Sequence, residues 1–94
     1  MSNIMDYNKN NQYIFNTTTL TVDNITEHLN TLVELLKTHS TIEINLSGIK
    51  HIDSAGVAFL LELNTIAKQK SCSIKFIEIP NTVEHLCQLY NIQL

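Results

Sequence analysis

The chain has 94 residues, of which 44% are hydrophobic and only 16% charged, and its formal net charge is −3. All six basic residues besides histidine are lysines and they form no basic run, so a nucleic-acid-binding face is not expected. No apolar stretch approaches the ~18 residues of a membrane span and no signal peptide opens the chain, so we expect a cytoplasmic protein without direct membrane insertion.

The N-terminal part of the chain predicts a tail followed by two short strands. Residues 1–11 are rich in asparagine and show no period, so we expect a flexible tail before a single domain over residues 12–94. Gln12–Asn16 and Thr19–Val22 contain threonine, aromatic and branched side chains, which favour strands. Because only two residues separate these segments, they predict an opening β-hairpin.

A helix and a central strand are predicted next. Asn24, with Glu27 three residues later, has the pattern of a capping box, and the apolar stripe that follows predicts a helix to about Thr38. Apolar and polar side chains then alternate over residues 42–47. This period of two predicts a strand with one buried face.

A second helix follows a loop at residues 48–52. Asp53 and Ser54 both favour the N-cap position, and apolar residues recur at helical spacing from Gly56 onward. A strand end, a short loop and a helix start therefore meet at this point. Such a junction gathers backbone N–H groups at the positive end of the helix dipole, so an anion or a modification placed there would interact strongly with the protein.

One more strand and a third helix complete the pattern. Residues 72–79 alternate as a strand that Pro80 ends, and Asn81 with Glu84 repeats the capping-box pattern before a helix that stops near Asn91. The order β-β-α-β-α-β-α predicts an α/β fold. We expect a mixed β-sheet of about four strands with helices packed mainly on one face.

Two motifs carry a resemblance to a known family. Residues 44–49, which read INLSGI, and residues 52–57, which read IDSAGV, resemble the signature of STAS domains, the fold of bacterial anti-anti-sigma factors. The resemblance implies the STAS fold. It also implies one possible function, an anti-anti-sigma factor that binds an anti-sigma kinase and is regulated by phosphorylation of Ser54; Ala55 stands where many of these factors carry a second Ser or Thr.

A second resemblance covers the end of the chain. Residues 66–70 and 83–92 look like the end of MlaB, the small STAS subunit of the Mla phospholipid transporter, whose last helix typically ends in a Leu-Tyr-Asn-Leu-like sequence. This resemblance implies a non-catalytic cytoplasmic subunit, peripheral to the inner membrane, that binds the transporter's ATPase, MlaF, and through it the permease complex that maintains outer-membrane lipid asymmetry. A Thr at the position of Ser54 is implicated in engaging that ATPase. We favour this interpretation over the anti-anti-sigma alternative.

The candidate partner-binding or phosphorylation site is the run Asp53, Ser54, Ala55, Gly56 and Val57. Ser54 either presents an uncharged hydroxyl to a partner or simply caps the helix. Asp53 is either the cap or a ligand for a lysine or arginine of the partner. Gly56 permits the close approach of a partner or of a neighbouring loop, or it serves internal packing.

Further partner contacts are expected on the second and third helices. Val57, Ala58 and Leu61 lie near the start of the second helix, and only one or two of them can face outward because this helix must also cover the sheet. Leu89 and Tyr90 are candidate anchors for a partner. Core packing is the alternative, and it is favoured for Tyr90, which falls on the apolar stripe of the third helix.

Enzymatic interpretations find little support in the sequence. His51, Asp53 and Ser54 are neighbours around one turn, so they are not arranged as base, orienting group and nucleophile. The histidines lack metal-ligand spacing, and no glycine-rich phosphate loop is present. Cys72 and Cys87 fall at apolar positions, which favours buried free thiols over a disulfide or a ligand pair. We therefore expect no catalysis, no cofactor and no metal.

Overall fold

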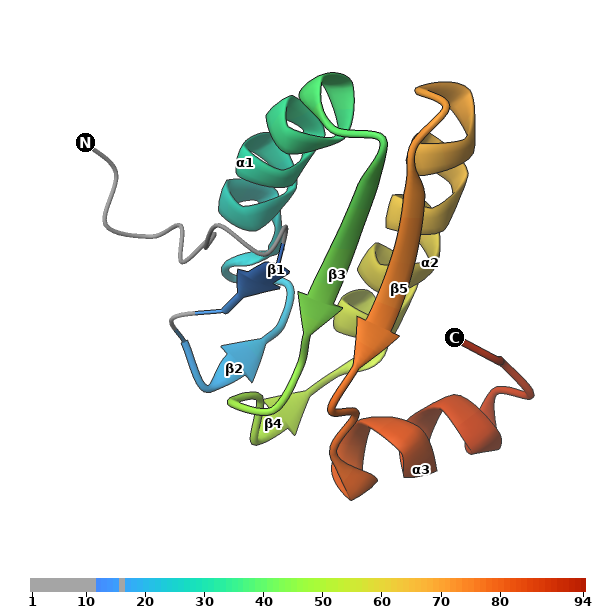
Figure 1. Cartoon of the computed structure of the whole chain (residues 1–94). Coiled ribbons are helices and arrows are strands. Elements are labelled where there is room, and N and C mark those ends of the chain that lie inside the picture. The colour runs from blue at the N-terminus through green and yellow to red at the C-terminus, as the bar shows by residue number, and fades with distance from the viewer. Residues whose placement is uncertain (1–11, 16) are drawn as a thin grey trace.

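The computed structural model describes residues 12–15 and 17–94, so the predicted tail at residues 1–11 lies outside the described part of the chain. The helices and strands alternate along the chain (Figure 1). Their bounds are β1 (Gln12–Ile14), β2 (Thr19–Leu20), α1 (Ile25–Thr38), β3 (Thr41–Asn45), β4 (His51–Ile52), α2 (Ser54–Gln69), β5 (Ser73–Ile77) and α3 (Asn81–Leu89).

Every strand pairing in this part of the chain is parallel. β3 pairs with β1 on one side and with β5 on the other, while β2 pairs with β4. Gln12 lies opposite Glu43, and Thr19 lies opposite His51. The number of residues along the chain that separates the two members is almost the same in both pairs. β1 and β2 are therefore successive segments that run alongside the successive segments β3 and β4.

The predicted opening hairpin is wrong, and so is the antiparallel part of the mixed sheet that it implied. Tyr13 and Leu20 are both fully buried, and pairing next to β3 and β4 carries both side chains into the core. The loop predicted at residues 48–52 also contains the short strand β4. A two-residue strand has no detectable period, so only its pairing with β2 reveals it.

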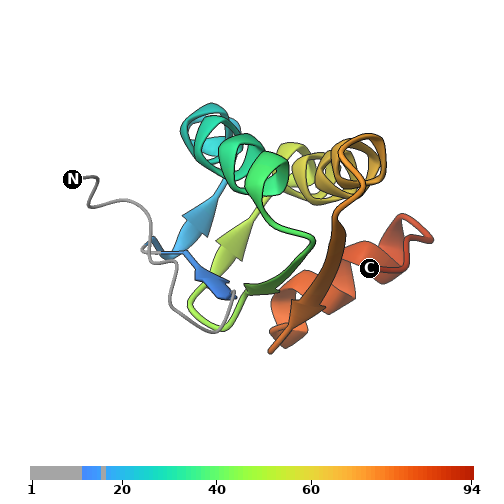
Figure 2. The same cartoon turned by 45° about the horizontal axis from the view of Figure 1, so that its top comes forward.

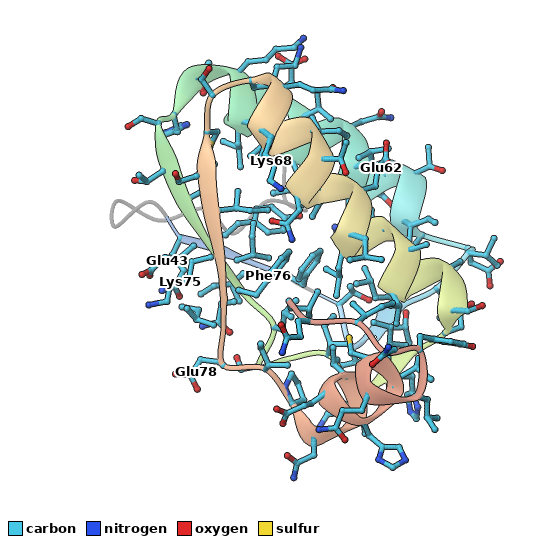
Figure 3. All side chains as sticks on the ribbon, turned by 90° about the vertical axis from the view of Figure 1, so that its right-hand side faces the viewer. Glu43, Glu62, Lys68, Lys75, Phe76 and Glu78 are labelled. Atoms are coloured by element: carbon cyan, nitrogen blue, oxygen red, sulfur yellow. The ribbon has the colours of Figure 1, made fainter. Side chains whose placement is uncertain are left out.

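The helices lie mainly on one side of the strands, as predicted. α1 and α2 cover that side together, and α3 lies at one end of the fold against β4 and α2 (Figures 1 and 2). Ile42 and Ile44 of β3 are buried in the core. Between them Glu43 points to the other face, next to its cross-strand neighbour Lys75 of β5 (Figure 3). The alternation along β3 thus separates the core from a polar face.

The two predicted capping boxes do not form. The Asn24 side chain bonds back to the preceding turn: its Oδ1 accepts from the Thr21 N–H at 3.0 Å, and its Nδ2 donates to the Thr19 carbonyl at 2.8 Å. α3 begins at Asn81 itself, after Pro80, and no side chain caps it. Asn24 therefore stabilises the connection between β2 and α1, whereas Pro80 precedes α3 in an extended conformation.

α2 and α3 end without glycine, in turns that need a left-handed residue. Ser71 and Asn91 have φ angles of 60° and 61°. After α2, the Cys72 N–H donates to the Ala67 carbonyl at 2.9 Å, which is the six-to-one bond of a Schellman motif. The motif satisfies a helical carbonyl and reverses the chain, so β5 starts close to the end of α2.

The two cysteines are buried free thiols, as predicted. Burial raises the pKa of the Cys72 thiol above its ordinary value. Burial, and then the neighbouring Glu84 carboxylate, raise the pKa of Cys87. Because the thiolate is the reactive form, both side chains serve as small apolar groups at neutral pH.

α1 buries a histidine among aromatic rings. His28 is 3% exposed, its Nδ1 lies 3.0 Å from the Tyr13 hydroxyl, and its ring centroid lies 5.0 Å from that of Phe15. Desolvation by burial lowers the pKa of His28, against a smaller opposing effect of the Glu27 carboxylate. The folded protein therefore holds His28 neutral at neutral pH.

This burial predicts an acid-sensitive stability. The folded state has a lower His28 pKa than the unfolded state, whose value is about 6.5. Above that pH the histidine is neutral in both states and the stability does not depend on its protonation. Below it the unfolded chain binds a proton that the folded chain does not, so the free energy of unfolding falls. We expect the free energy of unfolding in urea to fall less between about pH 7.5 and about pH 5.5 for His28→Asn, which cannot titrate, than for the wild type. His85→Asn, at an exposed histidine, should behave as the wild type. Equal pH dependence of all three proteins would contradict this prediction.

Candidate functional site

Asp53 connects β4 to α2 and caps the helix. Its Oδ1 accepts from the Gly56 N–H at 2.9 Å, and its main-chain carbonyl accepts from the Val57 N–H at 3.1 Å. Its Oδ2 accepts from the Val22 N–H at 3.3 Å, in the turn before α1. Of the two interpretations of Asp53, the structure therefore supports the cap, and both carboxylate oxygens bond to the protein's own backbone.

Ser54 is the first residue of α2 and is exposed. The structure records no side-chain hydrogen bond for it within residues 12–15 and 17–94, because Asp53 occupies the capping position. Ser54 is therefore not the helix cap. Its hydroxyl lies at the positive end of the helix dipole and faces solvent, where another molecule can reach it.

Gly56 and Val57 face the interior. A Cβ at Gly56 would meet the Leu20 carbonyl oxygen of β2 and would lie 2.7 Å from Cγ1 of Ile52. The Val57 side chain is 1% exposed. The close approach at Gly56 is therefore to the neighbouring strand. Val57 lines a groove on the outer side of α2, but its 1% exposure leaves almost no surface for a partner to contact.

The outward stripe of α2 starts at Ser54 and continues through Ala58 and Leu61, which are both exposed. Two shallow apolar grooves flank this stripe and share Ala58. One groove, of about 300 Å³, separates α2 from α1 and includes Ala55 and Leu29 in its lining. The expectation that only one or two of Val57, Ala58 and Leu61 face outward agrees with this arrangement.

The second groove brings the two candidate regions of the sequence together. It has a volume of about 340 Å³ and lies between the α2 stripe and the residues that follow α3. Tyr90 lines it and is 52% exposed, so its predicted place on the buried stripe of the third helix is wrong. The reason is that α3 ends at Leu89, which places Tyr90 in the turn beyond the helix.

We use the name α2 patch for the outward stripe of α2 together with the residues beside it that line the two grooves and are given at the end of this paragraph. Leu89 is 68% exposed but does not line either groove, so it lies outside the patch. Ile92 lines the second groove and was not singled out by sequence reasoning, because it follows the helical stripe. The patch consists of Ser54, Ala55, Ala58, Leu61, Tyr90 and Ile92.

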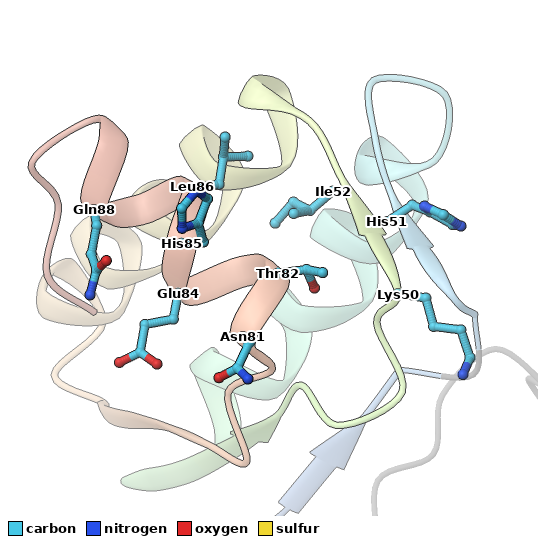
Figure 4. A pocket seen from close by; sticks show the side chains of 9 residues that line it. All are labelled: Lys50, His51, Ile52, Asn81, Thr82, Glu84, His85, Leu86 and Gln88. Carbon is cyan, nitrogen blue, oxygen red and sulfur yellow. The ribbon is translucent and has the colours of Figure 1, made fainter.

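A larger depression, lined mostly by residues with polar side chains, lies between β4 and α3 and has a volume of about 620 Å³ (Figure 4). Lys50 and His51 line it but point away from α3, whereas Ile52 points toward the helix. His51 and His85 therefore do not converge on one point. Among the described residues, no group of three or more histidine, cysteine or acidic side chains could hold a metal ion.

The chain forms an α/β domain in which a short strand leads through Asp53 into α2, with the exposed Ser54 at the start of the helix. A family model described as "Mlab, STAS domain" matches residues 17–93. The chain belongs to this family of STAS domains, which confirms the resemblance and the α/β STAS fold class predicted from the sequence. A search of curated proteins found no match.

No helix in the described part of the chain is long and apolar enough to cross a membrane. α2, which carries most of the site, and α3, which precedes Tyr90 and Ile92, both have apolar and polar side chains, as expected of helices that pack on one side only.

Proposed function

We propose that this protein is a non-catalytic STAS subunit that binds and supports the ATPase of an Mla-type phospholipid ABC transporter. It would act in the cytoplasm, and the transporter complex would hold it at the inner membrane. The family supports this proposal, and the observation that carries it is the exposed Ser54 hydroxyl at the edge of an apolar patch. The ATPase would supply all the nucleotide chemistry.

The α2 patch has the properties of a protein-docking surface. Apolar side chains that a folded chain usually buries are exposed here side by side: Leu61 is 36% exposed and Tyr90 is 52% exposed. A stable interface takes about 800 Å² from each partner, so a docked partner would contact the outward face of α2 and the chain beyond α3 together. An aromatic side chain such as Tyr90 often contributes much of the binding energy in such a surface.

Ser54 adds a polar contact without charge. A neutral hydroxyl can exchange a hydrogen bond with a partner at low desolvation cost, whereas a buried anion would be penalised strongly. The neighbouring Asp53 carboxylate is already bonded to the backbone at Gly56 and Val22. The junction therefore offers a partner an uncharged donor and acceptor on an apolar surface.

An anti-anti-sigma factor remains the second candidate function. The observation in its favour is that the same exposed Ser54 hydroxyl, which no capping bond occupies, is accessible to a kinase. A phosphate there would add ~1.5 to 2 negative charges at the helix start and would prevent docking on an apolar patch. The two candidates differ in the partner: a transporter ATPase in the first, an anti-sigma kinase in the second.

Co-expression with the Mla-type ATPase of the same genome tests the proposal. We expect the two proteins to purify as one complex, and Leu61→Glu to weaken binding at least about tenfold because it places a charge in the patch. Gln69→Glu, which adds the same side chain at the other end of α2, is the matched control and should bind as the wild type. Complex formation with a histidine-kinase-like anti-sigma factor, and none with the ATPase, would overturn the proposal in favour of the second candidate.

A further inference from the structure

The second groove of the α2 patch has one wall that is not a helix. The first wall is formed by α2, through Ser54, Val57, Ala58 and Leu61, and the other is formed by Tyr90 and Ile92. Both residues of that second wall follow the last residue of α3. The shape of the groove therefore depends on how the chain leaves α3.

The chain leaves α3 through a Schellman motif. The Asn91 N–H donates to the Gln88 carbonyl at 3.0 Å, and the Ile92 N–H donates to the Cys87 carbonyl at 2.8 Å. These are the five-to-two and six-to-one bonds of the motif, in which the first residue after the C-cap adopts a left-handed conformation. Asn91 is that residue, with a φ angle of 61°.

The turn directs Ile92 back onto the protein. Ile92 is partly buried and packs against the hydrophobic core, so the chain beyond α3 is held beside α2. A β-branched residue disfavours the left-handed conformation strongly, whereas asparagine tolerates it and glycine adopts it freely. With a residue that avoids this conformation, the chain would leave the helix in another direction.

The Asn91 side chain itself is exposed, and the structure records no hydrogen bond for it among the described residues. Its contribution is therefore the conformation of its backbone. We propose that Asn91 is a positioning residue of the α2 patch, whose left-handed turn brings Ile92 back beside Tyr90 and so completes the second wall of the groove. This inference rests on the proposed function, in which the patch binds a partner protein.

Three variants separate the backbone conformation from the side chain. Asn91→Gly keeps the turn and removes the side chain, Asn91→Val opposes the turn, and Gln93→Val adds the same valine two residues beyond it. We expect Asn91→Gly and Gln93→Val to bind the ATPase within about twofold of the wild type, and Asn91→Val to bind about tenfold more weakly. Equal weakening by glycine and valine would overturn the inference, because it would assign the effect to the Asn91 side chain.

A second measurement needs no partner. Amide hydrogen exchange at Ile92 should be slow in the wild type and in Asn91→Gly, and faster in Asn91→Val, where the bond to the Cys87 carbonyl is weakened. The amide resonances of Ser54, Ala58 and Leu61 should shift in Asn91→Val only. Unchanged exchange and unchanged resonances in Asn91→Val would also overturn the inference, whereas failure of the wild type to bind the ATPase would overturn the proposed function alone.

Discussion

Replacement of Gly56 by alanine is expected to destabilise the protein by about 3 kcal/mol and to lower its melting temperature by about 10–20 °C. The new Cβ would meet the backbone carbonyl of Leu20 and would come 2.7 Å from Cγ1 of Ile52. Leu20 belongs to β2, which pairs with β4, so the carbonyl cannot move away without disturbing that pairing. Urea and thermal unfolding of the purified variant measure the effect.

Gly48 provides a matched control for this substitution. A Cβ at Gly48 would lie 3.7 Å from the Phe15 carbonyl and 3.9 Å from the Thr17 carbonyl, which are ordinary contact distances. Its φ angle is not positive, so alanine fits its conformation. We expect Gly48→Ala to change the free energy of unfolding by less than about 1 kcal/mol. Equal stability of the two variants would show that α2 can shift away from β2 at little cost.

Replacement of Ser54 by glutamate is expected to weaken binding to the ATPase by about tenfold to a hundredfold while leaving the protein folded. A negative charge in the first turn of α2 interacts favourably with the helix dipole, so stability should change little. The same charge becomes costly when a partner removes water from the patch, because the exposed part of the patch around Ser54 offers no cation. Titration of the labelled ATPase with each variant measures the affinity.

Ser54→Gln separates charge from size in this experiment. Glutamine has nearly the shape of glutamate and no charge, so it should retain clearly more affinity than Ser54→Glu. Equal losses for the two variants would assign the effect to steric exclusion. Wild-type affinity of Ser54→Glu would show that the start of α2 lies outside the interface.

The sequence predicted the local features of the site well. The alternation over residues 42–47 and the helical spacing after Gly56 both correspond to observed elements, β3 and α2. Asp53 was one of two residues suited to the cap, and it is the one that caps α2. These features depend on a few neighbouring residues, which is why the sequence contains enough information to predict them.

Predictions that required a pairing partner were less successful. The segments Gln12–Asn16 and Thr19–Val22 are predicted as the strands of a hairpin. The strands β1 and β2 begin at these two segments, but their partners are β3 and β4. Short spacing in sequence favours a hairpin, and the burial of both Tyr13 and Leu20 favours pairing beside the central strands instead. The capping boxes failed for a similar reason, because Asn24 bonds to the preceding turn and Asn81 lies one position inside its helix.

The outward face of α2 could not be read from the sequence alone. Apolar residues occur almost all around its first two turns, so periodicity does not show which of them meet the sheet. The packing of α2 against β2 determines which side of the helix faces the strands. Gly56 lies against Leu20 and Val57 is buried, while Ala58 and Leu61 remain at the surface. The proximity of Tyr90 to Ser54 likewise depends on the packing of α3 against α2.

By itself, the sequence determined the α/β class, the start of a helix at Asp53 or Ser54, the buried thiols and the family, because each of these depends on composition or on residues close together in the chain. Only the tertiary structure decided which strands pair and which residues of the site reach the surface. Those outcomes depend on contacts between segments that are far apart in sequence, such as Gly56 with Leu20 and the α2 stripe with Tyr90. Local patterns do not specify such contacts, because several arrangements bury the same apolar residues and only the packing of the whole chain selects one.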